Sequence, residues 1–257
     1  MYSELRSQVL KLLSVHTRLD GRKPHEYRKP MKVEYGVVKT AEGSAKVTIG
    51  ETEVIAGVKL EIMSPYPDTP DEGSIMVGVE LLPLSSPEFE PGPPSIRAVE
   101  LARVVDRGIR ESKAIDFKSL CLEKGEKAWM IVIDICTFND AGNLFDASAL
   151  AALAAIKNTK FPELVDGKIV YKEKTDQGID VQEEPISVTV LKIGDHFIID
   201  PDNEEELVAE ARLTVALMSN GQLCALQKGG DSALTLDDIS KMIDLAAEGS
   251  KTLRGLL

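Results

Sequence analysis

Residues 129–158 constrain the fold most, because three structural signals follow one another there without a gap. Trp129–Phe138 is an apolar run with β-branched residues, which has the length and composition of a buried strand. Residues 139–143 (NDAGN) have the composition of a tight turn. Ala147–Ile156 is almost entirely Ala and Leu, which favours a helix packed close to a sheet. A strand, a glycine turn and a helix N-terminus together predict an anion pocket, because the first helical N–H groups lack intrahelical partners.

The composition indicates an ordinary globular protein. Its 257 residues can bury a sizeable core as one large domain or two smaller ones, and 43% of them are hydrophobic. No apolar run approaches the ~20 residues of a membrane span, and the N-terminus lacks the apolar region of a signal peptide. The three cysteines and the three histidines are scattered along the chain. We therefore expect a cytoplasmic protein without a disulfide framework, a metal cluster or a cofactor.

The charge balance limits how the chain can bind nucleic acid. It has 30 basic and 42 acidic residues, a formal net charge of −12. A protein that holds RNA or DNA alone usually has a basic surplus. Any contact of this chain with nucleic acid must therefore come from a local basic patch or be shared with a more basic partner.

Strands precede helices in both halves of the chain, without strict βαβ alternation, which predicts an α+β fold with mixed sheets. Residues 166–184, rich in Gly, Lys, Asp and Glu, are expected to form a mobile excursion around a short strand at 168–173. We place the boundary between two halves of one compact unit there, at 1–184 and 185–257. The expected strands are 33–41, 43–50, 52–62, 73–82, 129–138, 186–193, 196–199, 213–218 and 222–226, and the expected helices are 2–13, 96–113, 147–156 and 235–253.

Residues 18–32 (RLDGRKPHEYRKPMK) form an irregular basic arm with two prolines. One interpretation is a solvated connection between two elements. The other is an arm that reaches a polyanion. Composition alone favours the solvated connection.

The helix expected at 96–113 has a row of arginines opposite its apolar side. Ser95 is its candidate N-cap, and Arg103, Arg107 and Arg110 gather on one face at 100° per residue. These arginines could form local ion pairs worth only ~0.3–0.5 kcal/mol each. They could also hold phosphates, since a guanidinium matches phosphate oxygens. Spacing alone favours the ion pairs.

Seven features in this order resemble the RNase PH family over about Thr17–Leu253. Each is weak alone, but together and in this order they are specific. The resemblance implies an α+β fold of the ribosomal protein S5 domain 2-like kind, and phosphate-dependent removal of nucleotides from RNA 3′ ends. The features are R-L-D-G-R at 18–22 with Glu26 and Arg28, E-G-S-A-K-V at 42–47, G-x-T-x-V at 50–54, ELARVVDRGIRES at 100–112, the strand, turn and Ala-rich helix of 129–158, D-P-D-N-E-E-E at 200–206, and the capped last helix.

The chain departs from that family at the phosphate turn. Catalytic members carry Gly-Thr-Arg or Gly-Ser-Arg before the Ala-rich helix, whereas this chain has Gly142-Asn143-Leu144. Leu144 offers no donor where the family has a guanidinium, whose charge-assisted bonds are worth ~1.5–3 kcal/mol each. Asp146 adds a carboxylate in the first helical turn, which would stabilise the helix and repel phosphate. We therefore expect Asn143, Leu144 and Asp146 to form a degenerate phosphate site.

A second departure is independent of the first. Active members carry an Ala-Asp pair after their acidic run, and the matching pair here is Ala211-Arg212. Arg212 cannot be a general acid near neutral pH, because its pKa exceeds ~12. Glu206 keeps one carboxylate of the acidic run. The chain is therefore expected to have no catalytic residues and to be unable to carry out phosphorolysis alone.

These losses make the chain similar to the non-catalytic RNase PH-like subunits of the archaeal exosome. The resemblance implies a hexameric ring in which such subunits alternate with a catalytic RNase PH-like partner, and a cap of S1-type RNA-binding subunits. It also implies contact with single-stranded RNA through Arg103 and Arg107, which reverses the preference for local ion pairs on that helix. Arg97 and Arg110 are further candidates, whose orientation the spacing leaves open. The alternatives are an active phosphate-dependent 3′-to-5′ exoribonuclease, or an unrelated metabolic enzyme.

Overall fold

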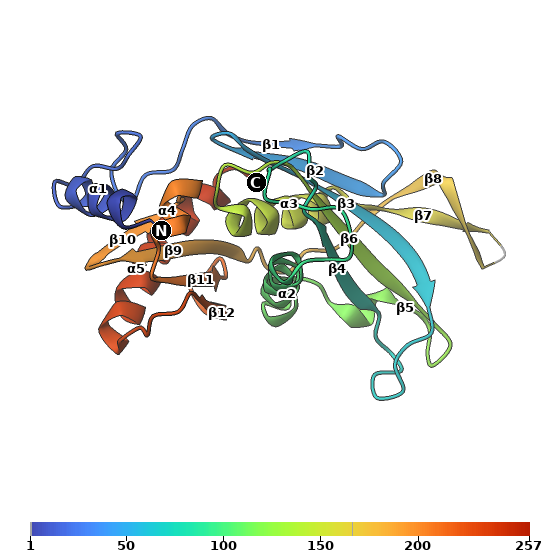
Figure 1. The fold of residues 1–257 in the computed structure, drawn as a ribbon. Helices are drawn as coiled ribbons and strands as arrows, with labels where there is room; N and C mark the ends of the chain where they lie inside the picture. Colours follow the sequence, from blue (N-terminus) through green and yellow to red (C-terminus); the bar gives the residue numbers. More distant parts are fainter. Residues whose placement is uncertain (1, 166) are drawn as a thin grey trace.

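The computed structural model describes residues 2–165 and 167–257 as an α+β arrangement of three sheets and surrounding helices (Figure 1). Within these residues, no helix is long and apolar enough to cross a membrane. The helices are α1 (Ser3–Leu13), α2 (Ile96–Glu111), η1 (Phe117–Leu120), α3 (Leu144–Asn158), α4 (Asn203–Val208) and α5 (Leu236–Arg254). The strands are β1 (Met31–Tyr35), β2 (Gly43–Ile49), β3 (Thr52–Met63), β4 (Ser74–Glu80), β5 (Cys121–Glu123), β6 (Lys127–Asn139), β7 (Lys160–Val165), β8 (Lys168–Gly178), β9 (Ile186–Ile193), β10 (His196–Ile199), β11 (Ala211–Leu217) and β12 (Leu223–Gly229).

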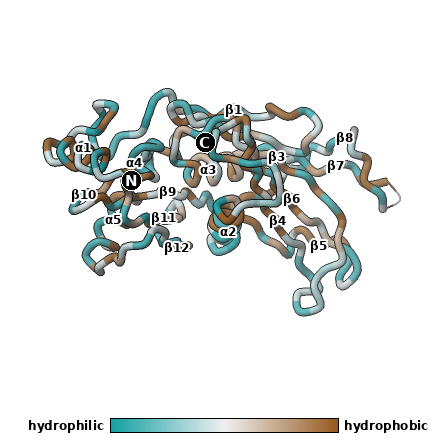
Figure 2. The backbone as a smooth tube through the Cα atoms, in the orientation of Figure 1, coloured by the Kyte–Doolittle hydropathy of each residue, from teal (hydrophilic) through white to brown (hydrophobic). Residues whose placement is uncertain are grey.

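The larger sheet has the strand order β1-β2-β3-β6-β4, with β5 also paired to β6. The expected strand at 129–138 is confirmed as β6, which runs antiparallel to β3 and parallel to β4. Alternate residues of β3, such as Val54 and Ala56, and of β6, such as Ile133 and Ile135, are buried in the same core as α3. In Figure 2, hydrophobic residues (brown) recur along β4 and β6, while the bends near α1 and α5 include hydrophilic (teal) stretches.

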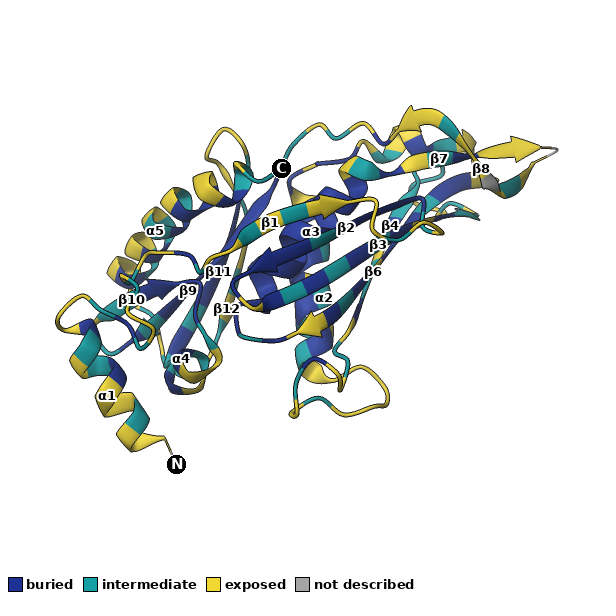
Figure 3. Cartoon of the chain, turned by 90° about the horizontal axis from the view of Figure 1, so that it is seen from above, coloured by how far each residue is buried: buried dark blue, intermediate teal, exposed yellow. Residues whose placement is uncertain are grey.

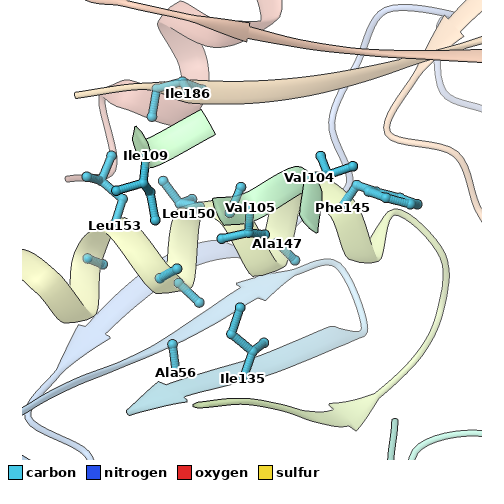
Figure 4. Close-up of a cluster of buried hydrophobic side chains, with 14 of the residues drawn as sticks. Ala56, Val104, Val105, Ile109, Ile135, Phe145, Ala147, Leu150, Leu153 and Ile186 are labelled. Atoms are coloured by element: carbon cyan, nitrogen blue, oxygen red, sulfur yellow. The ribbon is translucent and has the colours of Figure 1, made fainter. Parts of the chain in front are cut away.

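Helix α3 lies between the larger sheet and the second sheet, whose strand order is β10-β9-β11-β12. Every residue from Leu144 to Ile156 is buried, and the helix is almost uniformly dark blue in Figure 3. Figure 4 shows Ala147, Leu150 and Leu153 of this helix between β-strands and the side chains of α2. A helix with small apolar residues all round can pack on several faces at once, so the Ala-rich composition suits this central position.

The basic arm between α1 and β1 is tied to residues 199–205 of the second half of the chain. The fully buried Arg18 forms a bidentate ion pair with Glu205 of α4 and donates to the carbonyl oxygen of Ile199 at 2.8 Å. Arg22 and Arg28 both pair with the buried carboxylate of Asp200, at 3.1 and 2.9 Å. The arginines of this arm therefore serve as internal partners, and neither the solvated connection nor the polyanion arm describes them.

Several expected elements have other bounds in the structure. Helix α3 begins at Leu144, three residues before the expected Ala147, because Asn143 takes a left-handed conformation (φ 59°) and turns the chain straight into the helix. Strand β1 ends before Gly36 (φ 68°), so residues 37–41 lie outside it. Residues 168–178 form β8 in a hairpin with β7 that projects from the body (Figure 1), longer than the expected strand at 168–173. Asp166 lies outside the described residues.

Candidate functional site

The turn between β6 and α3 packs against the turn and first residues of α4, and we call these two segments the cradle (residues 140–143 and 200–206). Gly142 has a φ of +97°, and a Cβ there would lie 2.5 Å from the carbonyl oxygen of Pro201. Only glycine fits so close an approach with that backbone conformation. The position predicted from sequence as a glycine turn is thus held against a segment some sixty residues further along the chain.

The cradle holds a carboxylate of the chain itself. The backbone N–H of Asn143, at the start of α3, donates to Oε1 of Glu206 at 2.8 Å. Glu206 is part of the acidic run D-P-D-N-E-E-E, and its side chain is partly buried. Burial raises the pKa of Glu206, while the charge of Arg97 and the N–H of Asn143 act in the opposite direction. The N–H group that could bind an external anion is therefore occupied by an internal one.

Arg97 contacts both segments of the cradle. Its guanidinium is 3.2 Å from the carboxylate of Glu206 and 3.5 Å from that of Asp140, and it lies over the ring of Phe89 at 5.5 Å. These contacts come from three different parts of the chain. Arg97 is thus engaged with two carboxylates at the N-terminal end of α2, apart from the other arginines predicted to bind RNA.

Side-chain hydrogen bonds to backbone groups hold the turn at residues 140–143 of the cradle. Arg28 donates to the carbonyl oxygens of Ala141 and Gly142, and the hydroxyl of Thr52 donates to the Gly142 carbonyl at 2.7 Å. The same Thr52 oxygen accepts the N–H of Ala141 at 3.2 Å. The positions of Arg28 and Thr52 were part of the sequence resemblance, but their role in holding this turn depends on contacts that no local pattern indicates.

The structure places Leu144 and Asp146 inside the protein. Leu144 is 1% exposed and packs in the core, so the position carries no donor toward the cradle. Asp146 is fully buried, and its Oδ2 accepts a hydrogen bond from the side-chain amide of Asn143 at 3.0 Å. The carboxylate at the N-terminus of α3 is therefore that of Glu206, which accepts the N–H of Asn143. The carboxyl group of Asp146, expected there from the sequence, is buried in the interior.

Arg212, predicted from the resemblance to stand at the position of the family's acid, is the second residue of β11. Its guanidinium lies 4.0 Å from the centre of the Phe145 ring and forms an ion pair with Glu100 of α2. Burial lowers the pKa of Arg212, while the carboxylates of Glu100 and Glu206 raise it. A guanidinium that is stacked and paired in this way holds α2, α3 and β11 together.

The row of arginines on α2 separates into two groups. Arg103 and Arg107 are exposed and line a groove of about 500 Å³ with Gln227 of β12, to which Arg107 donates at 3.4 Å. Arg110 instead pairs with Asp106 at 2.9 Å, donates to the carbonyl oxygen of Ile75 at 3.1 Å and lies over the ring of Phe117. Two of the four arginines predicted to bind RNA therefore line a groove, whereas Arg110, which is also exposed, is engaged with Asp106 and the Ile75 carbonyl.

The three histidines lie closer together than their scatter in the sequence suggested. His16, His25 and His196 line one groove of about 380 Å³ beside α5. Within the described residues, however, no three His, Cys, Asp or Glu side chains are placed to hold a metal ion.

Comparison with known proteins places the chain in a family. The model of the 3′ exoribonuclease family, domain 1, matches residues 27–162, and that of domain 2 matches residues 183–249. The chain is similar to the exosome complex component Rrp42 of Methanothermobacter thermautotrophicus, with 44% identity over 95% of this chain and 90% of the relative. The Rrp42 of Archaeoglobus fulgidus is also 44% identical, over 97% of this chain and 94% of that protein.

Solved structures have the same fold. A chain of the Archaeoglobus fulgidus exosome with RNA bound to the active site superposes with a TM-score of 0.90 at 43% identity, over 98% of this chain and 97% of that one. A chain of an archaeal exosome core gives a TM-score of 0.85 at 40% identity, over 98% and 95%. The α+β expectation is thereby confirmed, and the chain belongs to the 3′ exoribonuclease family, the RNase PH family.

Proposed function

We propose that this chain is a non-catalytic ring subunit of an archaeal RNA exosome, a 3′-to-5′ phosphorolytic exoribonuclease complex, and that it contacts RNA. The observation that carries the proposal is the hydrogen bond of 2.8 Å from the N–H of Asn143 to Glu206. Phosphorolysis needs inorganic phosphate beside the RNA end. An internal carboxylate at the helix N-terminus competes for the same N–H group and repels a second anion.

The environment of Arg212 supports the same conclusion. A residue that gives a proton to a leaving group must have a pKa near the working pH. Arg212 occupies the acidic position of the family, and a guanidinium cannot supply that proton. The burial of Leu144 and the ion pair of Arg212 with Glu100 support the proposal that this site lacks the family's guanidinium donor and its acid.

The exposed pair Arg103 and Arg107 supplies the RNA contact in this proposal. Both residues are exposed and line the groove beside β12, where phosphates of a single strand could approach them. The net charge of −12 is compatible with RNA binding that is shared with a partner. Arg97 and Arg110 have internal partners, so we assign them a smaller part in RNA binding.

The proposed partners follow from the relatives. We infer a ring in which this chain alternates with a catalytic RNase PH-like subunit and shapes that subunit's active site, with S1-type RNA-binding subunits as a cap. The chains that it resembles come from an archaeal exosome core and from an exosome with RNA bound to the active site. The cytoplasm is the proposed compartment.

Reconstitution with the catalytic partner tests this function. We expect size-exclusion chromatography with light scattering to give a hexameric ring, and the ring to shorten single-stranded RNA only when phosphate is present. A ring whose catalytic partner carries a disabled phosphate site should be inactive, while Glu206→Gln in this chain should leave the activity unchanged. Phosphate-dependent shortening by the ring with the disabled partner would instead support the alternative, an active exoribonuclease with a phosphate site on Arg103 and Arg107.

A further inference from the structure

A buried carboxyl group lies behind the cradle and has no part in the proposed function. Asp146 is the third residue of α3 and is fully buried. The groups near it come from three other parts of the chain: Tyr27 of the basic arm, Thr189 of β9, and Asp200 after β10. Tyr27, Thr189 and Asp200 are buried as well, so this carboxyl group has no direct route to solvent.

Asp146 has too few partners for a buried negative charge. Its Oδ2 accepts one hydrogen bond, from Nδ2 of Asn143 at 3.0 Å, and its Oδ1 has no hydrogen-bond partner among the described residues. The same Asn143 nitrogen also donates to Oδ1 of Asp200 at 2.9 Å. Asp200 is paired with Arg22 and Arg28, whereas no ion pair of Asp146 occurs in the described part of the chain.

The same helical position in α5 provides a contrast. Asp238 is also the third residue of its helix, but its carboxylate accepts hydrogen bonds from Lys192 at 2.7 Å and from the backbone N–H of Thr235 at 2.9 Å. These bonds stabilise the charged form and lower the pKa of Asp238 to about 2. An aspartate in the first helical turn is normally favourable as an anion, so the surroundings of Asp146 reverse the usual preference.

We propose that Asp146 holds a proton in the stable fold, and that its ionisation weakens the Asn143 contacts behind the cradle and makes this region pH-sensitive. Ionisation places a second negative charge beside Asp200, and a single amide group must then serve both carboxylates. The backbone N–H of Asn143 also binds Glu206, so the proton on Asp146 and the closed cradle are coupled through one residue, Asn143. This inference does not depend on whether the chain binds RNA.

The direction of the pKa shift agrees with the geometry and sets the pH window. Burial is the main cause that raises the pKa of Asp146 to about 7, and the charge of Asp200 acts in the same direction, while Thr189 beside the carboxyl group and the amide of Asn143 oppose the shift. The unfolded chain has the ordinary value of 3.8. The folded protein therefore binds more protons between about pH 4 and pH 7, and its stability falls as the pH rises through that window.

The test compares urea unfolding of the wild type with that of Asp146→Asn at pH 5 and pH 8. Asparagine mimics the neutral acid and cannot ionise, so the variant should lose this pH dependence. We expect the unfolding equilibrium constant of the wild type to rise between these pH values by roughly tenfold to a hundredfold more than that of the variant. Asp238→Asn is the matched control, and its pH dependence should follow the wild type, because Asp238 is ionised at both pH values.

Identical pH dependence of the wild type and Asp146→Asn would overturn the proposal. If the variant does not fold, the ¹³C chemical shift of the Asp146 carboxyl carbon in the wild type decides the question. A titration midpoint within about one pH unit of 7 supports the inference. A carboxyl group that stays ionised from pH 5 to pH 8 overturns it.

Discussion

At the scale of single residues, the carboxylate of Glu206 decides what the cradle can bind. One of its oxygens accepts the N–H of Asn143 and the other lies 3.2 Å from Arg97. An incoming phosphate would have to displace this carboxylate from both donors while the negative charge stayed nearby. The N–H of Asn143 and the guanidinium of Arg97 are therefore already engaged with an internal anion.

Replacing Glu206 by alanine should open the cradle. The N–H of Asn143 and the guanidinium of Arg97 lose a partner, so we expect a loss of about 1–3 kcal/mol in the free energy of unfolding. Millimolar inorganic phosphate should then raise the melting temperature of Glu206→Ala but not that of the wild type, because only the variant has free donors. Glu204→Ala, at an exposed position of the same helix, is the control. A phosphate-dependent shift in the wild type would show that the cradle is not filled.

Restoring the family's acid at position 212 should not restore chemistry. Arg212→Asp removes the guanidinium from the ring of Phe145 and places a carboxylate opposite Glu100. We expect a loss of about 1–3 kcal/mol in stability and no phosphorolysis by the isolated variant. Chemical denaturation measures the loss of stability, and an RNA shortening assay measures phosphorolysis. Activity in the single variant would mean that the remainder of the site is intact.

At this site, the local structure could be predicted from the sequence, but the long-range contacts could not. The glycine turn and the start of α3 depend on neighbours within a few positions, so the strand, turn and helix could be predicted locally. The Glu206 bond joins residues that are 63 positions apart, and the Arg28 bond to the Gly142 carbonyl spans 114. The sequence resemblance marked Leu144 and Arg212 as lacking a donor and an acid, but nothing local indicated which group fills the cradle.

At the scale of elements, α2 has two kinds of arginine. Arg107 follows Arg103 by one helical turn and both face the groove beside β12, while Arg110 is held by Asp106 and by the Ile75 carbonyl. Helical spacing grouped the three correctly on one side of the helix. Helical spacing could not reveal that Arg110 donates to the carbonyl oxygen of Ile75, because Ile75 lies in β4, outside the helix.

This difference gives a matched pair of variants for RNA binding. In the reconstituted ring, Arg103→Glu with Arg107→Glu should weaken RNA binding and lower the slope of log affinity against log salt by up to about 1.4, at ~0.7 per lost phosphate contact. Arg110→Glu should leave both quantities near the wild-type values. Filter binding at several salt concentrations measures them, and light scattering confirms assembly. Equal losses of RNA affinity in the two variants would contradict the assignment of RNA binding to Arg103 and Arg107.

At the scale of the whole molecule, α3 makes the two halves interdependent. We proposed 1–184 and 185–257 as halves of one unit, and the burial of α3 between the two sheets supports that proposal. The ion pair between Arg18 and Glu205 also joins the halves. The individual strands and the Ala-rich helix could be predicted from local sequence patterns. The packing of that one helix against two sheets depends on residues far apart in the chain and could not.

Expressing residues 1–184 alone tests this interdependence. The fragment would expose the side of α3 that packs on β9, and Arg18 would lose its partners Ile199, Asp200 and Glu205. Loss of this apolar interface is strongly destabilising, so we expect no cooperative thermal transition. Circular dichroism and calorimetry provide the measurement. A sharp two-state transition would show that the halves are separate folding units.

The most direct measurement of the central claim uses the isolated chain. Single-stranded RNA with a labelled 5′ end is incubated with the purified protein and inorganic phosphate, and release of nucleoside diphosphates from the 3′ end is followed as shortening of the labelled strand. With Glu206 in the cradle and Arg212 in place of the acid, the isolated chain should release none above a protein-free control, while the same preparation mixed with its catalytic partner does so. Phosphate-dependent release by the isolated chain, lost in Arg107→Ala, would contradict this account.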